Sequence, residues 1–200
     1  HRPFHPSGKT LPIFGETIET PFGPAAGPNT QLAQNIVAGY FGGARFFELK
    51  TVQKMDGAEL AACINRPCIL AEDECYNCEW STELTVPQAF EEYVKAWCAC
   101  KMLAKLYGLG DPNGFVFNMS VGYDLEGIKG DKVNTFIDGM MEAKDTAVFQ
   151  ECKKWLLDNA DRFHNFTREF IEAIPSDVCN SATISTLHGC PPQEIESIAN

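Results

Sequence analysis

The feature that most constrains the fold is a pattern that recurs four times along this 200-residue chain. In each unit a short apolar run ends in small or polar residues and is followed by a loop and a helical stretch. Strands that alternate with helices in this way pair in parallel, because each helix returns the chain to the same end of the sheet. We therefore expect four adjacent, parallel strands. The expected strands are 22–27, 45–51, 114–121 and 180–187.

The segments between these runs differ in length and composition. Apolar residues recur at helical spacing over 29–41 and 88–107, which predicts two amphipathic helices. The segment 52–86 is rich in Cys, Asn and acidic residues, so we expect a long loop there, and such loops often carry function. A charged loop over 124–132 and broken helical material over 133–174 complete the expectation.

The chain opens with a different pattern, which predicts a short β-hairpin. Two short β-forming runs, 11–14 and 17–20, flank a Gly-Glu pair. We therefore divide the chain into a lead-in with a hairpin, 1–20, and an α/β part, 21–200.

Both a doubly wound sheet and a (β/α)8 barrel contain such units. The Gly-rich turn at 23–28 lacks the G-x-G-x-x-G spacing that places a pyrophosphate at a helix N-terminus, and the chain has no Walker A motif. These absences argue against a dinucleotide-binding sheet. We expect the first half, about four βα units, of a TIM-barrel-like (β/α)8 domain in a longer polypeptide.

Composition excludes several classes of partner. The formal net charge of −11 and pI near 4.8 would repel nucleic-acid phosphates and anionic lipid. No apolar stretch approaches the roughly 18 residues of a membrane span, and the chain opens without a secretion signal. We expect a cytoplasmic protein without nucleic-acid partners or membrane insertion.

Nine cysteines at irregular spacing favour reduced thiols over a disulfide framework. Cys63 with Cys68, and Cys75 with Cys78, could supply four thiolates to zinc or iron. No other pair repeats that spacing, so we interpret them as small buried apolar residues and expect no metal site.

Candidate cofactor-binding residues lie at the carboxyl ends of the expected strands, where barrels carry their chemistry. Small residues at the first end let a flat ligand approach the backbone. A lysine at the second end can stabilise an anionic reduced flavin, although it could also extend to solvent. The residues expected to bind the cofactor are Ala25, Ala26, Gly27, Lys50, Thr51 and Asn118.

Two further segments carry candidate substrate-binding and catalytic residues. Asn77 and Glu79 lie in a polar stretch bounded by aromatic residues, which could cover a planar ligand or form a surface turn. Cys190 precedes an expected helix start, where a helix N-terminus lowers the pKa of a thiol and suits proton transfer. His188 is a possible catalytic partner, and the alternative for both is a structural loop residue.

Five separated motifs, in the same order, resemble the amino-terminal domain of YgfK-type proteins, a family labelled as a selenate reductase subunit. The motifs are Pro21–Pro28, Glu48–Gln53, Glu79–Glu83, Phe117–Tyr123 and Leu187–Pro192. This family is in turn similar to the flavin domain of dihydropyrimidine and dihydroorotate dehydrogenases. The resemblance implies an FMN-bearing barrel preceded by a small hairpin.

The resemblance also implies roles for single residues. It implies that Lys50, Thr51 and Asn118 contact the flavin, that Asn77 faces the substrate, and that the Cys190 thiol is the acid/base. The later portions of such proteins are similar to glutamate synthase small subunits, which implies iron–sulfur clusters, FAD and an NAD(P)H site outside these residues.

Two functions follow as hypotheses. In the first, the intact protein passes electrons between NAD(P)H, iron–sulfur clusters and an FMN in this barrel. The reduced FMN then reduces the substrate, which is a small planar heterocycle or an oxyanion such as selenate. In the second, the barrel has no flavin and docks redox partners. The expected partners are a small-molecule substrate, the rest of the polypeptide and other redox subunits.

We predict that residues 1–200 alone do not hold FMN tightly. In (β/α)8 enzymes the flavin phosphate usually rests on the loops after strands seven and eight, beyond the four units found here. Titration of FMN into the isolated segment checks this. Binding at micromolar affinity, roughly 8 kcal/mol, by a soluble monomer would contradict the expected position of the site.

Overall fold

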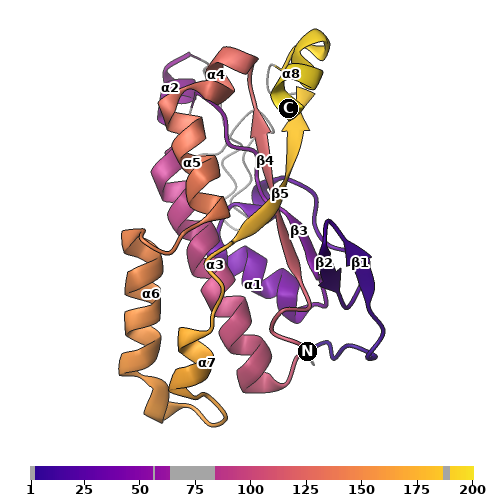
Figure 1. Ribbon diagram of the computed structural model, residues 1–200, viewed down its shortest axis with the longest axis vertical. Coiled ribbons are helices and arrows are strands. Elements are labelled where there is room, and N and C mark those ends of the chain that lie inside the picture. Colours follow the sequence, from indigo (N-terminus) through magenta and orange to yellow (C-terminus); the bar gives the residue numbers. More distant parts are fainter. Residues whose placement is uncertain (1–2, 56, 64–83, 187–189) are drawn as a thin grey trace.

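The computed structural model describes residues 3–55, 57–63, 84–186 and 190–200, and a parallel sheet lies at its centre (Figure 1). The strands are β3 (Phe46–Glu48), β4 (Val116–Gly122) and β5 (Cys179–Ser185), in the order β3-β4-β5. Both pairings are parallel. Three of the expected strands are therefore confirmed as adjacent and parallel, and they form an open sheet within the described residues.

The expected strand at 22–27 is wrong as a regular strand. Its backbone runs beside β3 but mainly accepts hydrogen bonds: Arg45 N donates to Phe22 O (3.0 Å) and Glu48 N donates to Pro24 O (3.2 Å). Pro24 has no N–H and cannot complete a ladder. A Cβ at Gly23 would overlap the carbonyl oxygen of Phe46, so only glycine permits this approach.

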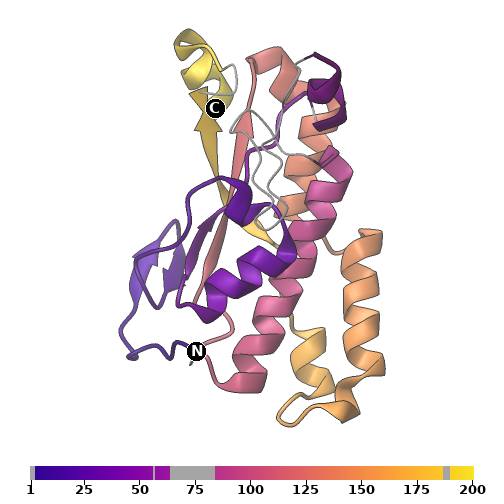
Figure 2. The same ribbon diagram turned by 180° about the vertical axis from the view of Figure 1, so that it is seen from behind.

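Helices cover one face of the sheet, and α3 (Val86–Tyr107) makes the central contact (Figures 1 and 2). Its start is fixed by a capping box between Thr85 and Gln88. The Trp97 ring packs against Phe115 (5.1 Å) and against Phe117 of β4 (5.4 Å). These edge-to-face contacts join the helical layer to the sheet.

The remaining helices follow the expected pattern with two corrections. The charged segment expected as a loop contains a short helix, because Asp124 caps it by accepting a hydrogen bond from Gly127 N (2.7 Å). The long expected loop likewise begins with a helix, α2. The other helices are α1 (Ala33–Phe41), α2 (Gly57–Cys63), α4 (Leu125–Lys129), α5 (Asp131–Met141), α6 (Ala147–Asp158), α7 (Arg168–Glu172) and α8 (Ile195–Ala199), with 3-10 turns η1 (Pro28–Thr30), η2 (Ala160–Arg162) and η4 (Pro192–Glu194).

The expected hairpin is confirmed as β1 (Leu11–Ile13) and β2 (Glu16–Ile18), which pair antiparallel. Its two-residue turn places Phe14 and Gly15 at positive φ, 51° and 80°. The hairpin lies on the side of the sheet opposite the helices, where the Phe14 ring packs against Phe46 of β3 (6.2 Å). The hairpin therefore covers apolar surface that the helices leave exposed.

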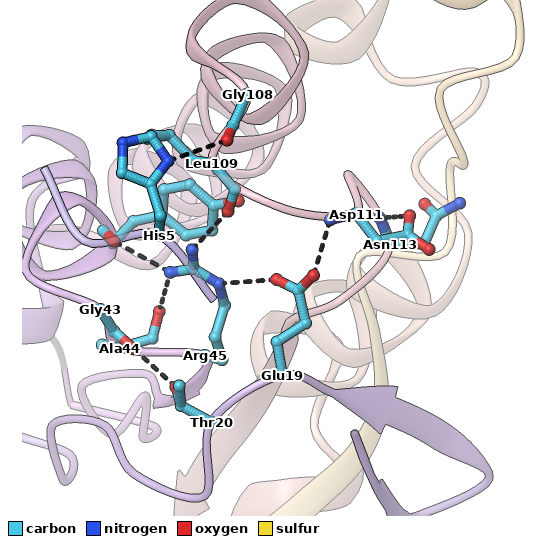
Figure 3. Close-up of polar contacts among 11 residues, drawn as sticks. His5, Glu19, Thr20, Gly43, Ala44, Arg45, Gly108, Leu109, Asp111 and Asn113 are labelled. Carbon is cyan, nitrogen blue, oxygen red and sulfur yellow. Dashed lines mark hydrogen bonds and ion pairs between the residues drawn. The ribbon is translucent and has the colours of Figure 1, made fainter. Parts of the chain in front are cut away.

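A buried ion pair attaches the segment after the hairpin to the amino-terminal ends of the strands (Figure 3). Arg45 Nε contacts Glu19 Oε2 at 3.2 Å, and the exposed fractions of the two side chains are 0% and 8%. Nη1 donates to the carbonyl oxygens of Tyr40 and Ala44, and Nη2 donates to that of Leu109. Glu19 Oε1 also accepts from Asp111 N (2.7 Å). The Glu19 carboxylate and three backbone carbonyl groups thus stabilise the buried charge of Arg45.

We predict that Glu19→Ala lowers the stability of the domain by about 3–5 kcal/mol, because it leaves the Arg45 guanidinium buried without its counter-charge. Glu91→Ala is the matched control, since Glu91 pairs with Lys95 on the surface with 53% of its side chain exposed. That variant should change stability by less than about 1 kcal/mol. Urea unfolding of the intact protein measures both, and equal effects would contradict the anchoring role of Glu19.

Candidate functional site

The alternation of side chains along β3 and β4 gives the sheet one apolar and one polar face. Phe47, Leu49, Phe117, Met119 and Val121 belong to the hydrophobic core shared with the helices. Side chains of successive strand residues point to opposite faces. The polar residues between these positions therefore lie on the face away from the helices: Glu48, Asn118 and Ser120. Lys50 and Thr51 follow beyond the end of β3.

Asn118, an expected cofactor-binding residue, is held by two hydroxyl groups of the neighbouring strand. Its Nδ2 donates to Thr183 Oγ1 (2.8 Å), and Ser181 Oγ donates to its Oδ1 (2.7 Å). The residue is 2% exposed. Sequence reasoning missed Ser181 and Thr183, although polar residues at every second position of β5 are the signal that would have identified them.

Thr51, next to Lys50, is brought together with Ser120, a residue of the Phe117–Tyr123 motif to which the sequence assigned no role. Each of the expected pair is 2% exposed, so the Lys50 side chain does not extend to bulk solvent. The hydroxyls of Thr51 and Ser120 lie 2.8 Å apart. Tyr93 of α3 donates its hydroxyl to Lys50 O (2.8 Å), and burial raises the pKa of that phenol, so Tyr93 remains a donor. The backbone of Lys50 is thus fixed from the helical layer.

The expected small residues lie in the loop beside β3. Ala25 is exposed, whereas Ala26 is half-buried and donates its backbone N–H to Glu48 Oε2 (3.1 Å). Gly27 exchanges hydrogen bonds with the Thr30 hydroxyl. A Cβ at Gly27 would meet only Ala25 O, at 3.8 Å. Packing within the described residues therefore does not require glycine at position 27, and space beside its backbone is open.

Cys190 lies after β5, and the pKa of its thiol differs from the expectation. The residue is 3% exposed, and burial, followed by the charge of Glu194, raises its pKa above that of an ordinary thiol. The expected lowering at a helix N-terminus is therefore wrong. The structure that follows is the 3-10 turn η4 and a five-residue helix, α8, and η4 places the Glu194 carboxylate near the thiol.

Several expected residues cannot be placed. His188, Asn77 and Glu79 lie outside the described residues, as do Cys68, Cys75 and Cys78. All six described cysteines are free thiols. Among the residues that the structure covers, no three His, Cys, Asp or Glu side chains gather in a way that could hold a metal ion. Within the same residues, no helix has the length and apolar character needed to cross a membrane.

Buried donors and acceptors of this kind can recognise a planar ligand with carbonyl and ring-nitrogen atoms. Lys50 supplies positive charge, Thr51 and Ser120 supply hydroxyls, and Asn118 supplies an amide. Hydrogen bonds between neighbouring segments orient the two hydroxyls and the amide. Preorganised groups of this type are what ligand sites at the carboxyl ends of parallel strands contain.

Comparisons with known proteins agree with this architecture. Residues 2–200 match the family model described as "Oxidoreductase YgfK, N-terminal TIM-barrel domain". The chain is 49% identical over 203 residues to "Putative oxidoreductase YgfK" of Escherichia coli K12, and equally to that of Escherichia coli O157:H7. These alignments cover 96% of this chain but 19% of each relative. No solved structure matches the chain. The chain belongs to the family of amino-terminal TIM-barrel domains of YgfK oxidoreductases.

Proposed function

We propose that residues 21–200 form the first half of a (β/α)8 flavin barrel that binds FMN on the polar face at the carboxyl ends of β3 and β4. The buried Lys50, beside the linked hydroxyls of Thr51 and Ser120, is the observation that carries this proposal. A buried lysine places positive charge where a ligand that becomes anionic on reduction would be stabilised. Among the described residues a Cβ at Gly27 would meet only Ala25 O, which supports close approach of a flat ring to this backbone.

The protein groups at this site have distinct roles in the proposal. FMN, when bound, supplies the ability to accept and deliver electrons. Lys50 offsets negative charge, Asn118 and Ser120 orient the ring through their hydrogen-bonding groups, and the backbone at Gly27 sets how closely it can approach. The apolar face and the helices behind it exclude water from the opposite side of the strands.

The raised pKa of Cys190 defines the role that its thiol can take. A thiol with a raised pKa stays protonated at neutral pH, so Cys190 would act as a proton donor to the substrate as it is reduced. Asn77 and Glu79 are proposed to bind the substrate, and His188 to assist Cys190.

For the intact protein we propose a multi-cofactor oxidoreductase. The chain spans about a fifth of the length of its curated relatives, so most of such a protein lies elsewhere. Iron–sulfur clusters, FAD and NAD(P)H in those parts would deliver electrons to the FMN. The proposed substrate is a small planar heterocycle or an oxyanion such as selenate, and a barrel without flavin that docks redox partners is the competing function.

We predict that the intact protein contains FMN and that Lys50→Met weakens FMN binding by roughly tenfold to a hundredfold, the usual effect of losing a charged hydrogen-bond donor. Methionine keeps the side-chain length while removing the charge. Lys144→Met, at an exposed lysine in the loop between α5 and α6, is the matched control and should leave FMN content unchanged. Absorbance spectra and chromatography of released flavin measure both. Purified protein without flavin would favour the docking function instead.

We predict that Cys190 is alkylated slowly at pH 7, because iodoacetamide reacts with the thiolate and the raised pKa reduces the thiolate fraction. Its rate should keep rising above about pH 8.5, where an ordinary thiol is already half ionised. Cys63 is exposed and serves as the internal reference in peptide mapping. A Cys190 that reacts faster than Cys63 at pH 7 would contradict the role of proton donor.

A further inference from the structure

A small cavity lies at the amino-terminal ends of β4 and β5, at the opposite end of these strands from Lys50. Its volume is about 230 Å³, and it is bounded by α3, the hairpin and the segment before β5. None of its lining residues belongs to the proposed flavin site. The polar or charged side chains in its wall are Glu16, Lys101, Asn113, Asp177 and Asn180, with Trp97 beside them.

Lys101 forms one wall and is 2% exposed. Its Nζ donates to Asn113 Oδ1 (3.0 Å) and lies 3.7 Å from the centre of the Trp97 ring and 4.7 Å from that of Phe115. Burial lowers the pKa of Lys101 to about 8, and the charges of Asp177 and Glu16 oppose that change. An ammonium group has three donors, so a ligand acceptor in the cavity would further stabilise its charge.

Two carboxylates form another part of the wall. Asn180 Nδ2 donates both to Glu16 Oε1 (2.9 Å) and to Asp177 Oδ2 (3.0 Å), so a single amide holds the two acids together. Neither acid forms an ion pair with Lys101 among the residues that the structure describes. The cavity therefore presents separated positive and negative charge.

We propose that this cavity binds a small zwitterion of the α-amino acid class, with its carboxylate on Lys101 and Asn113 and its ammonium group on Asp177 and Glu16. A simple anion would meet two carboxylates, and a simple cation would meet Lys101. Only a ligand that carries both charges is attracted to both walls.

The size of the cavity supports the same class. At about 30 Å³ per water molecule in the liquid, a volume of 230 Å³ corresponds to roughly eight water-sized groups. That space accepts an amino acid with a short side chain. A bound ligand would bridge the hairpin, α3 and the segment before β5, so binding should also raise the thermal stability of the domain.

Calorimetric titration of the intact protein with glycine, L-alanine and L-serine tests the proposal. Acetate and methylamine are the controls, because each carries one of the two charged groups of glycine. We expect saturable binding of at least one amino acid and no binding of either control at the same concentration. Absence of binding by all three amino acids, or equal binding of acetate, would overturn the proposal.

Variants identify the site. Lys101→Met retains the contact with Trp97 without the charge, and Asp177→Asn removes the opposite charge; each should weaken binding of the amino acid roughly tenfold or more. Asp145→Asn, at an exposed acid between α5 and α6, should have no effect. FMN content should be unchanged in all three, which separates this site from the flavin site. If Lys101→Met does not fold, Asp177→Asn decides, and unchanged affinity in that variant would overturn the assignment.

Discussion

Burial of β4 on both faces is the constraint on which the rest of this structure depends. All seven residues of Val116–Gly122 are buried, including Asn118 and Ser120. A buried amide or hydroxyl without a partner costs about 1–3 kcal/mol, so both neighbouring strands must present matching groups. Thr51 supplies one for Ser120, and Ser181 and Thr183 supply two for Asn118. The hydrogen bonds that the buried polar side chains of β4 require therefore bring together fixed polar groups from β4, from β5 and from the segment after β3.

The two ends of the sheet have different roles. One end stabilises the fold, and the other carries the proposed chemistry. At the amino-terminal end the Arg45–Glu19 pair and its carbonyl partners are fully buried and hold the segment after the hairpin against the strands. At the carboxyl end Asn118 lies on the polar face, and the buried Lys50 donates its backbone N–H to Thr30 O, in the turn that follows Gly27. This division is the usual one in (β/α)8 barrels, where loops at the carboxyl ends can vary without disturbing the core. The cavity at Lys101 is an exception, since it places a proposed ligand site at the structural end.

How far the sequence predicted the site depends on how local each signal is. Lys50, Thr51 and Asn118 were expected because a polar residue at the end of an apolar run is visible in one segment. Ser120, Ser181 and Glu48 were given no role because their importance arises from partners in other segments of the chain. The pKa of Cys190 was expected to fall at a helix start, whereas burial and the nearby Glu194 raise it. Burial, the larger cause, depends on tertiary packing, which a local motif does not contain, whereas Glu194 belongs to the same local segment as Cys190.

The sequence by itself determined the order of elements, the parallel pairing and the family, because hydrophobic periodicity and motif spacing are properties of the chain. It also predicted the helix over 88–107, which the structure shows as α3 from Val86 to Tyr107. Only the tertiary structure decided that residues 22–24 lie beside β3 without forming a strand, and that Gly23 is required there by the Phe46 carbonyl. Likewise, only the fold brought Lys101 within reach of Asn113 and placed Asp177 and Glu16 across a cavity from it. The physical reason is that close approach and desolvation depend on segments far apart in the chain, and no local pattern specifies them.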